Sequence, residues 1–287
     1  MAKQTRRSGA VARAIPLALV LFGLLAAVFA LAPSRLAAQS TDEIVARILA
    51  ARGGLEKAKA VRSERISGTI YFSPEFFGPF VAEFKRPGKM HNEVTIQSRT
   101  VVRTLNGKGA GWVLNPFAGK DKPEAMSPEA MSPEELKDAG NESDFDGPLI
   151  DAKAKGNTIE FSRMEQVEGK DAYVLKVTHK DGTVSDYAFD AKTYLLAKWS
   201  GTDNVNGESV TRETLFHDYR EVNGLKFPFE LISSNPGADP SQRLTQRIVV
   251  EKVEVDPQID EAHFEKPAAA AAPGAAGDPP AAAAGRH

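Results

Sequence analysis

The sequence predicts a mainly β protein: a curved, unclosed antiparallel β-barrel of about eleven strands, with an N-terminal helix and a helical insertion on its concave face. Apolar and polar residues alternate over most of the chain beyond residue 62, as they do in half-buried antiparallel strands. Turn sequences such as Asn106-Gly107 and Asn223-Gly224 separate these runs and favour hairpins. A sheet of this length curls, because its strands twist.

The first 38 residues have the features of an export signal. Lys3, Arg6, Arg7 and Arg13 precede an uncharged apolar run over residues 14–32, and the segment ends in Arg-Leu-Ala-Ala. We expect cleavage before the glutamine at position 39 and release into the periplasm. The run is close to the ~20 residues that cross a bilayer, so an uncleaved anchor in the inner membrane is the alternative.

The folded region, predicted over residues 39–266, begins with two short helices. Ser40 or Thr41 is a suitable N-cap for a helix whose apolar residues recur at helical spacing to about Ala51. A Gly-Gly pair ends this helix, and residues 55–61 predict a second, shorter one. These helices are candidates to fill the concave face of the curled sheet.

Two groups of strands follow, over about residues 62–117 and 158–256. Because consecutive strands are joined by short turns, an up-and-down meander is the simplest topology. After the Asn223-Gly224 turn, apolar residues occupy every second position on both sides of Pro228, at Leu225, Phe227, Phe229 and Leu231. This alternation predicts that these side chains line the concave face. Pro228 is then expected to point outward, at a bulge or an edge where its missing N–H is tolerated.

The insertion between the two groups of strands, from Met126 to Lys155, is rich in helix-forming residues, and the pentapeptide EAMSP occurs twice in succession over residues 124–133. Ser132 begins a Ser-Pro-Glu-Glu sequence that is typical of a helix start. Phe145, Leu149 and Ile150 offer an apolar face to a second short helix. The insertion is therefore the second candidate to cover the concave face.

Composition excludes several kinds of function. The chain has no cysteine, hence no disulfide, no thiolate nucleophile and no acceptor for a lipoprotein anchor. All 38 acidic residues and all but five of the 36 basic residues follow residue 38. This leaves the mature chain acidic, which argues against a nucleic-acid partner. The five histidines do not have metal-ligand spacing, and we expect no cofactor and no enzymatic activity. His217 is the one histidine that alternation places toward the interior.

Several stretches of the sequence resemble the bacterial outer membrane lipoprotein-sorting family, which has a LolA/LolB-like fold. They are ILAARGGLEKAKAVRSERISGTI, TLNGKGAGWVLNP, DFDGPLIDAKAKGNTIEF, EQVEGKDAYVLKVTHKDGTVSDYAFDAKTYLLAKW, DYREVNGLKFPFEL and VDPQIDEAHFEKP, in this order between residues 41 and 267. The resemblance implies a half-barrel with a hydrophobic cavity under a helical lid. It also implies an arginine that reaches from a strand to lock the lid; Arg65 and Arg103 lie in predicted strands.

Together these features predict a monomeric periplasmic carrier that holds lipoprotein acyl chains or another lipid in an apolar cavity. The residues expected to line it are Ile70, Phe72, Phe80, Phe84, Val94, Trp112, Phe145, Leu149, Leu225, Phe227, Phe229 and Leu231. The alternative is a membrane-anchored envelope sensor or protein-interaction domain with a filled core, whose partner is an envelope membrane protein. Residues 267–287 are rich in Ala, Pro and Gly and predict a disordered tail.

Overall fold

The computed structural model describes residues 40–117, 127–205, 208–236 and 245–268. The predicted signal or anchor and nearly all of the Ala/Pro-rich tail lie outside these residues. Within the described part of the chain, no helix combines the length and the apolar character needed to cross a membrane.

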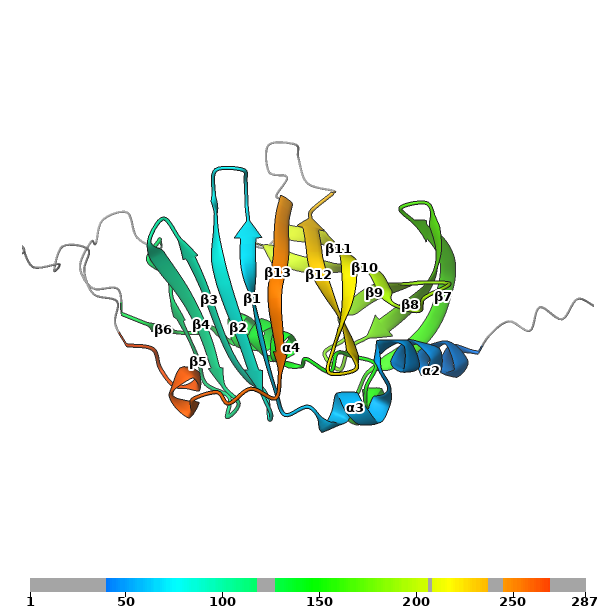
Figure 1. Ribbon diagram of the computed structural model, residues 1–287, viewed down its shortest axis with the longest axis horizontal. Coiled ribbons are helices and arrows are strands. Elements are labelled where there is room, and N and C mark those ends of the chain that lie inside the picture. The colour runs from blue at the N-terminus through cyan, green and yellow to red at the C-terminus, as the bar shows by residue number, and fades with distance from the viewer. Residues whose placement is uncertain (1–39, 118–126, 206–207, 237–244, 269–287) are drawn as a thin grey trace, which may run out of the picture. The chain divides into compact units, whose positions relative to one another are not determined.

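Thirteen strands form a single antiparallel sheet in the order β6-β5-β4-β3-β2-β1-β13-β12-β11-β10-β9-β8-β7 (Figure 1). The two ends of this order, β6 and β7, are not paired with each other, so the predicted unclosed barrel is confirmed. The bounds are β1 Ser63–Tyr71, β2 Phe77–Lys85, β3 Lys89–Ile96, β4 Arg99–Asn106, β5 Gly111–Leu114, β6 Glu129–Ala130, β7 Thr158–Val167, β8 Lys170–Thr178, β9 Val184–Asp190, β10 Leu196–Val205, β11 Glu208–Val222, β12 Leu225–Ser234 and β13 Thr245–Val255.

The sheet consists of two meanders, β1–β6 and β7–β13, joined side by side rather than end to end. The first strand pairs with the last, with Ile66 opposite Val253. This differs from the single meander that the sequence favours. The strands of each half are neighbours along the chain, but the junction between the halves is a long-range contact that local spacing does not specify.

Four α-helices and one 3₁₀-helix accompany the sheet in the described residues. They are α2 Thr41–Arg52, α3 Leu55–Ala60, α4 Pro133–Ser143, α5 Ala152–Lys155 and η3 Glu261–Phe264. Ser40 caps α2 and Ser132 caps α4, each through a reciprocal capping box with a glutamate three residues on. The second helix of the insertion begins later than predicted, at Ala152. The apolar residues expected on it therefore lie in the α4–α5 loop (residues 144–151).

Helices cover the two arms of the sheet and give each its own core. The α4 side chains pack on β2–β5, where Met90 and Leu105 are buried. The α2 residues Ile44 and Ile48 pack against Leu175 and other residues of β8 and β9. A third cluster joins α3 and the α4–α5 loop to β12 and β13 in the middle of the sheet. The N-terminal helix and the insertion thus pack on the concave face of the sheet, as predicted.

The β11–β12 hairpin separates from both of its neighbours at its turn end. Pairing of β12 with β13 ends at Glu230, and pairing of β10 with β11 ends at Leu215. Pro228 lies beyond the last β12–β13 pair, so its missing N–H interrupts no ladder on that side. Pro228 is half-buried and contributes to the wall of a cavity described below.

The turn of this hairpin lies against the corner between α2 and α3. Gly53 has φ 127°, and a Cβ there would stand 2.2 Å from the carbonyl oxygen of Gly224. We therefore expect Gly53→Ala to lower the free energy of unfolding by roughly 2–4 kcal/mol, measured by urea denaturation. The matched control is Gly54→Ala, because Gly54 has φ 100° and no atom near its Cβ position. Equal losses in the two variants would show that the contact with Gly224 is unimportant.

Candidate functional site

A cavity of about 260 Å³ lies between α2, the α4–α5 loop and strands β9–β12. We call it the inner cavity. Its volume is just below the ~300–1,000 Å³ typical of small-molecule sites, and most of its wall is apolar. It is lined by Ile48, Leu49, Arg52, Asp146, Gly147, Pro148, Leu149, Tyr187, Phe189, Tyr194, Leu195, Leu196, Phe216, Tyr219, Lys226, Phe227 and Pro228.

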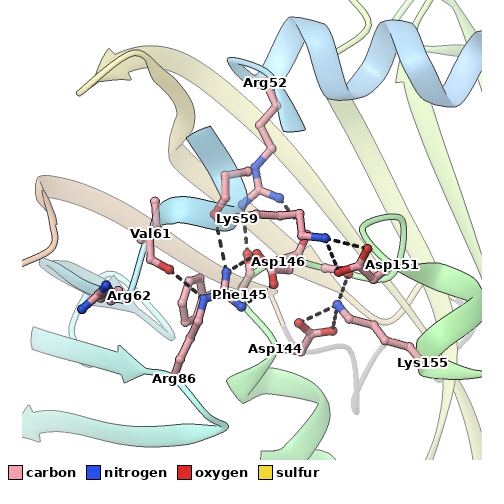
Figure 2. A network of polar contacts seen from close by, with 12 residues as sticks. Arg52, Lys59, Val61, Arg62, Arg86, Asp144, Phe145, Asp146, Asp151 and Lys155 are labelled. Atoms are coloured by element: carbon pink, nitrogen blue, oxygen red, sulfur yellow. Dashed lines mark hydrogen bonds and ion pairs between the residues drawn. The ribbon is translucent and has the colours of Figure 1, made fainter. Parts of the chain in front are cut away.

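The α4–α5 loop forms one side of the inner cavity and is held by two arginines (Figure 2). Arg86, at the end of β2, donates to both carboxylate oxygens of Asp146 at 2.6 Å and to the Val61 carbonyl oxygen at 2.7 Å. Arg52, at the end of α2, donates to the carbonyl oxygens of Phe145 and Asp146 at 2.9 Å. These bonds tie the loop to the sheet and to the α2–α3 corner.

Further ion pairs fix the two ends of the same loop. Lys155 of α5 donates to Asp144 at 2.7 Å and to the Gly147 carbonyl oxygen at 2.8 Å. Lys59 of α3 donates to Asp151 at 3.0 Å, as Figure 2 shows. The loop is therefore positioned by side chains from α2, α3, β2 and α5, although it has no regular structure of its own.

Two buried carboxyl groups near these arginines have opposite pKa shifts. Burial would raise the pKa of Asp146, but the hydrogen bonds and charge of Arg86 outweigh burial and lower it. Burial raises the pKa of Glu64 to about 7, and the charge of Arg52 only partly opposes this. Glu64 is 4% exposed and shares the face of β1 that carries Ile66. The interior next to the cavity thus holds a carboxyl group that titrates near neutrality.

Two of the twelve residues predicted to line a cavity, Leu149 and Phe227, lie in the wall of the inner cavity. Most of the others are core residues. Phe84 packs against α4, whereas the group around α3 and the α4–α5 loop contains Phe80, Phe145, Leu225, Phe229 and Leu231. Ile70 is buried and Val94 is half-buried. Helices and large side chains occupy the space that these residues enclose.

Two predicted residues lie apart from this core. Phe72 is 41% exposed beyond the end of β1. Trp112 pairs with Thr104, whose hydroxyl contacts His91, while its neighbour Val113 packs toward α4. Because successive side chains of a strand point to opposite faces, Trp112 lies on the face away from α4.

Most of the inner cavity is built from residues that the sequence did not single out. Tyr187, Phe189, Phe216 and Tyr219 come from strands that alternation predicted, but none of them was among the residues expected to line a cavity. Arg52 is the last residue of α2, and its side chain lies in the wall of the inner cavity. The aromatic residues of β9–β11 could have indicated a cavity in this region, but such residues occur equally in a packed interior.

Of the two arginines considered for lid locking, Arg103 contacts a helix of the insertion, whereas Arg65 pairs within the sheet. Arg65 pairs with buried Glu83, which also contacts His263 at 2.7 Å. Arg103 of β4 reaches Glu142 of α4 at 2.7 Å. His217 lies 3.6 Å from Glu168. In the described residues, no group of three or more His, Cys, Asp or Glu side chains could hold a metal ion.

No family model matches the chain, and no curated protein matches it significantly. A solved DUF1329 family protein from Desulfovibrio piger aligns with 79% of this chain and 98% of its own, with a TM-score of 0.52 and 12% sequence identity. The two proteins share one fold. At this identity the likeness to the DUF1329 family protein concerns the fold alone.

Two further solved structures match over a similar extent. A LolA superfamily protein from Nitrosomonas europaea has 13% identity and a TM-score of 0.47, covering 79% of this chain and 98% of its own. An outer membrane lipoprotein-sorting protein domain from Vibrio parahaemolyticus has 11% identity and a TM-score of 0.48, covering 78% and 95%.

Proposed function

We propose that this protein binds an acyl chain of a lipid or lipoprotein in the inner cavity and carries it in the periplasm, without converting it chemically. The observation that carries the proposal is the apolar cavity of about 260 Å³ beside the arginine-held α4–α5 loop. Each CH₂ group moved from water into such a site gains ~0.8 kcal/mol. The resemblance of the sequence to lipoprotein-sorting proteins agrees with this function.

The cavity favours a single short chain over several long ones. The inner cavity of about 260 Å³ is bounded by α2, the α4–α5 loop and β9–β12, whereas α4 packs on the arm formed by β2–β5. A ligand with two or three chains needs α4 or the α4–α5 loop to move. We expect a preference for single-chain lipids.

Filling the inner cavity should weaken binding. Leu149→Trp places a large ring where the chain would lie, and displacing two buried CH₂ groups at ~0.8 kcal/mol each weakens binding about tenfold. The measurement is displacement of a fluorescent fatty acid by unlabelled fatty acid. The control is Leu55→Trp, because Leu55 is 37% exposed on α3 and does not line the cavity.

The alternative function, an envelope sensor or protein-interaction domain, makes the opposite prediction. It predicts that wild-type protein purified from the periplasm yields no lipid on solvent extraction and binds no fatty acid probe. Sequencing of the mature N-terminus adds a second test. A start at residue 39 supports a free carrier, and a start near residue 1 supports an anchored module.

A further inference from the structure

A second cavity, of about 230 Å³, lies on the opposite face of β8 and β9 from the inner cavity. We call it the outer cavity. Its wall includes Val167 and Ala172, which form a cluster with Val174 and Ala188. The inner cavity instead uses Phe189, which clusters with α2. Because successive residues of a strand face opposite sides, the two clusters lie on opposite faces of the sheet.

The two cavities share part of their walls. Leu195, Leu196, Phe216 and Tyr219 line both of them. The sheet offers no ladder at this point, because pairing of β10 with β11 ends at Lys198 and Leu215. A single side-chain bond bridges the two strands beyond that pair: the Tyr219 hydroxyl donates to the Leu196 carbonyl oxygen at 2.9 Å. The cavities therefore share these four residues, and the Tyr219–Leu196 hydrogen bond lies between the two strands at this point.

The backbone on both sides of this gap is irregular. A bulge interrupts the pairing of β9 with β10 between Leu196 and Lys198. In β11, Asp218 has φ 52°, a conformation that is uncommon for a residue other than glycine. Bulges and strained residues of this kind concentrate at binding sites, where they redirect side chains. Here the two irregular positions lie next to Leu196 and Tyr219, the residues joined by that hydrogen bond.

The walls of the two cavities differ in chemistry. The inner cavity is mainly apolar, with Arg52, Asp146 and Lys226 as its charged residues. The charged groups of the outer cavity are the carboxylates of Glu168, Asp171, Asp190 and Asp218, with Lys170 and His217 as the basic groups. Asp190 and Asp218 already accept hydrogen bonds from Thr193 and Arg220. A hydroxyl or amine group can donate to Glu168 or Asp171, whereas another carboxylate would be repelled.

We propose that the gap between β10 and β11 is a port through the sheet, closed by Tyr219. A single-chain amphiphile occupies it with the apolar chain in the inner cavity and a hydroxyl or amine end in the outer cavity. This inference rests on the proposed function and adds to it a route of entry and a preference for the polar end. The chain then enters through the sheet, and the α4–α5 loop need not move.

The port is tested by the rate at which a bound apolar probe, N-phenylnaphthylamine, leaves the protein in a stopped-flow experiment. A hydrogen bond of this kind contributes ~0.5–1.5 kcal/mol, so Tyr219→Phe should release the probe about 2- to 10-fold faster. The matched control is Tyr71→Phe, because Tyr71 is a half-buried strand tyrosine that lines neither cavity. Equal release rates for wild type and Tyr219→Phe would overturn the port.

The polar end is tested by competition of dodecylamine, dodecanol and dodecanoic acid for the same probe. We expect the amine and the alcohol to bind more tightly than the acid. Thr193→Trp, which fills the outer cavity alone, should remove this preference. Thr183→Trp is the control, because Thr183 holds a similar turn through Asp181 and lines neither cavity. An unchanged preference in Thr193→Trp would overturn the outer site.

The outcomes separate this inference from the proposed function. If wild-type protein binds neither probe nor amphiphile, the proposed function fails and the port fails with it. If wild type binds the probe and Leu149→Trp binds it about tenfold more weakly, the inner cavity is the binding site. In that case Tyr219→Phe tests the port and Thr193→Trp tests the outer cavity, each independently of the proposed function. Circular dichroism of each variant confirms that it is folded.

Discussion

Replacing Arg86 with alanine should lower the free energy of unfolding by about 2–4 kcal/mol in urea denaturation. The Asp146 side chain is 9% exposed and depends on Arg86 for two hydrogen bonds of 2.6 Å. Removing one partner of a buried ion pair costs ~3–5 kcal/mol. The expected loss is somewhat smaller because the Arg86 side chain is 36% exposed, and water can partly replace it.

The control for Arg86 is Arg103→Ala. Arg103 also joins a strand to the insertion, through Glu142, but the two side chains are 34% and 40% exposed. Exposed pairs contribute ~0.2–1 kcal/mol, so this variant should be nearly as stable as wild type. The double variant Arg86→Ala with Asp146→Asn should recover part of the loss, since no unpaired buried charge remains. Similar losses for Arg86 and Arg103 would contradict the special role of the buried pair.

Replacing Glu64 with glutamine should change the pH dependence of stability by about 3 kcal/mol. Burial raises the folded-state pKa of Glu64 to about 7 from an ordinary value of 4.5. Its contribution to stability is therefore full below pH 4.5 and is lost as the pH rises through about 7. At 1.36 kcal/mol per pKa unit, wild type should lose roughly 3 kcal/mol relative to Glu64→Gln between pH 4 and pH 9.

The measurement is urea denaturation of both proteins at a series of pH values, compared as the difference in unfolding free energy. Glu56→Gln serves as the control, because Glu56 is exposed on α3 and its replacement should leave the pH profile unchanged. Parallel profiles for Glu64→Gln and wild type would show that Glu64 is not held as an acid in the interior. Asp146 has the opposite sign: its lowered pKa stabilises the fold above its ordinary pKa of 3.8 and loses this effect in acid.

Local features of the fold could be predicted from the sequence because they depend on neighbouring residues. Alternation with a period of two identified the long strands, since side chains of a strand point alternately to its two faces. Ser40 and Ser132 identified two helix starts, since a cap acts within one turn of the helix. The short β6 was not predicted, because its two residues carry no periodic pattern.

The candidate site was predicted only in kind. The sequence shows that the strands carry enough apolar residues to cover one face of a curved sheet. It does not distinguish a cavity-wall residue such as Phe216 from a core residue such as Phe229, because both occur in strands with the same alternation of apolar and polar residues. Whether the space beside them is empty depends on how far α2, α4 and the α4–α5 loop extend into the sheet. That distance is the outcome of packing among segments far apart in the chain.

The sequence by itself therefore determined the strands, the main helix starts and the apolar face of the sheet, because each follows from residues within a few positions of one another. Only the tertiary structure decided that β1 pairs with β13, that Arg86 meets Asp146 across 60 positions, and that a cavity remains beside Tyr219. These features arise from contacts between distant segments, whose geometry is set by the packing of the whole domain.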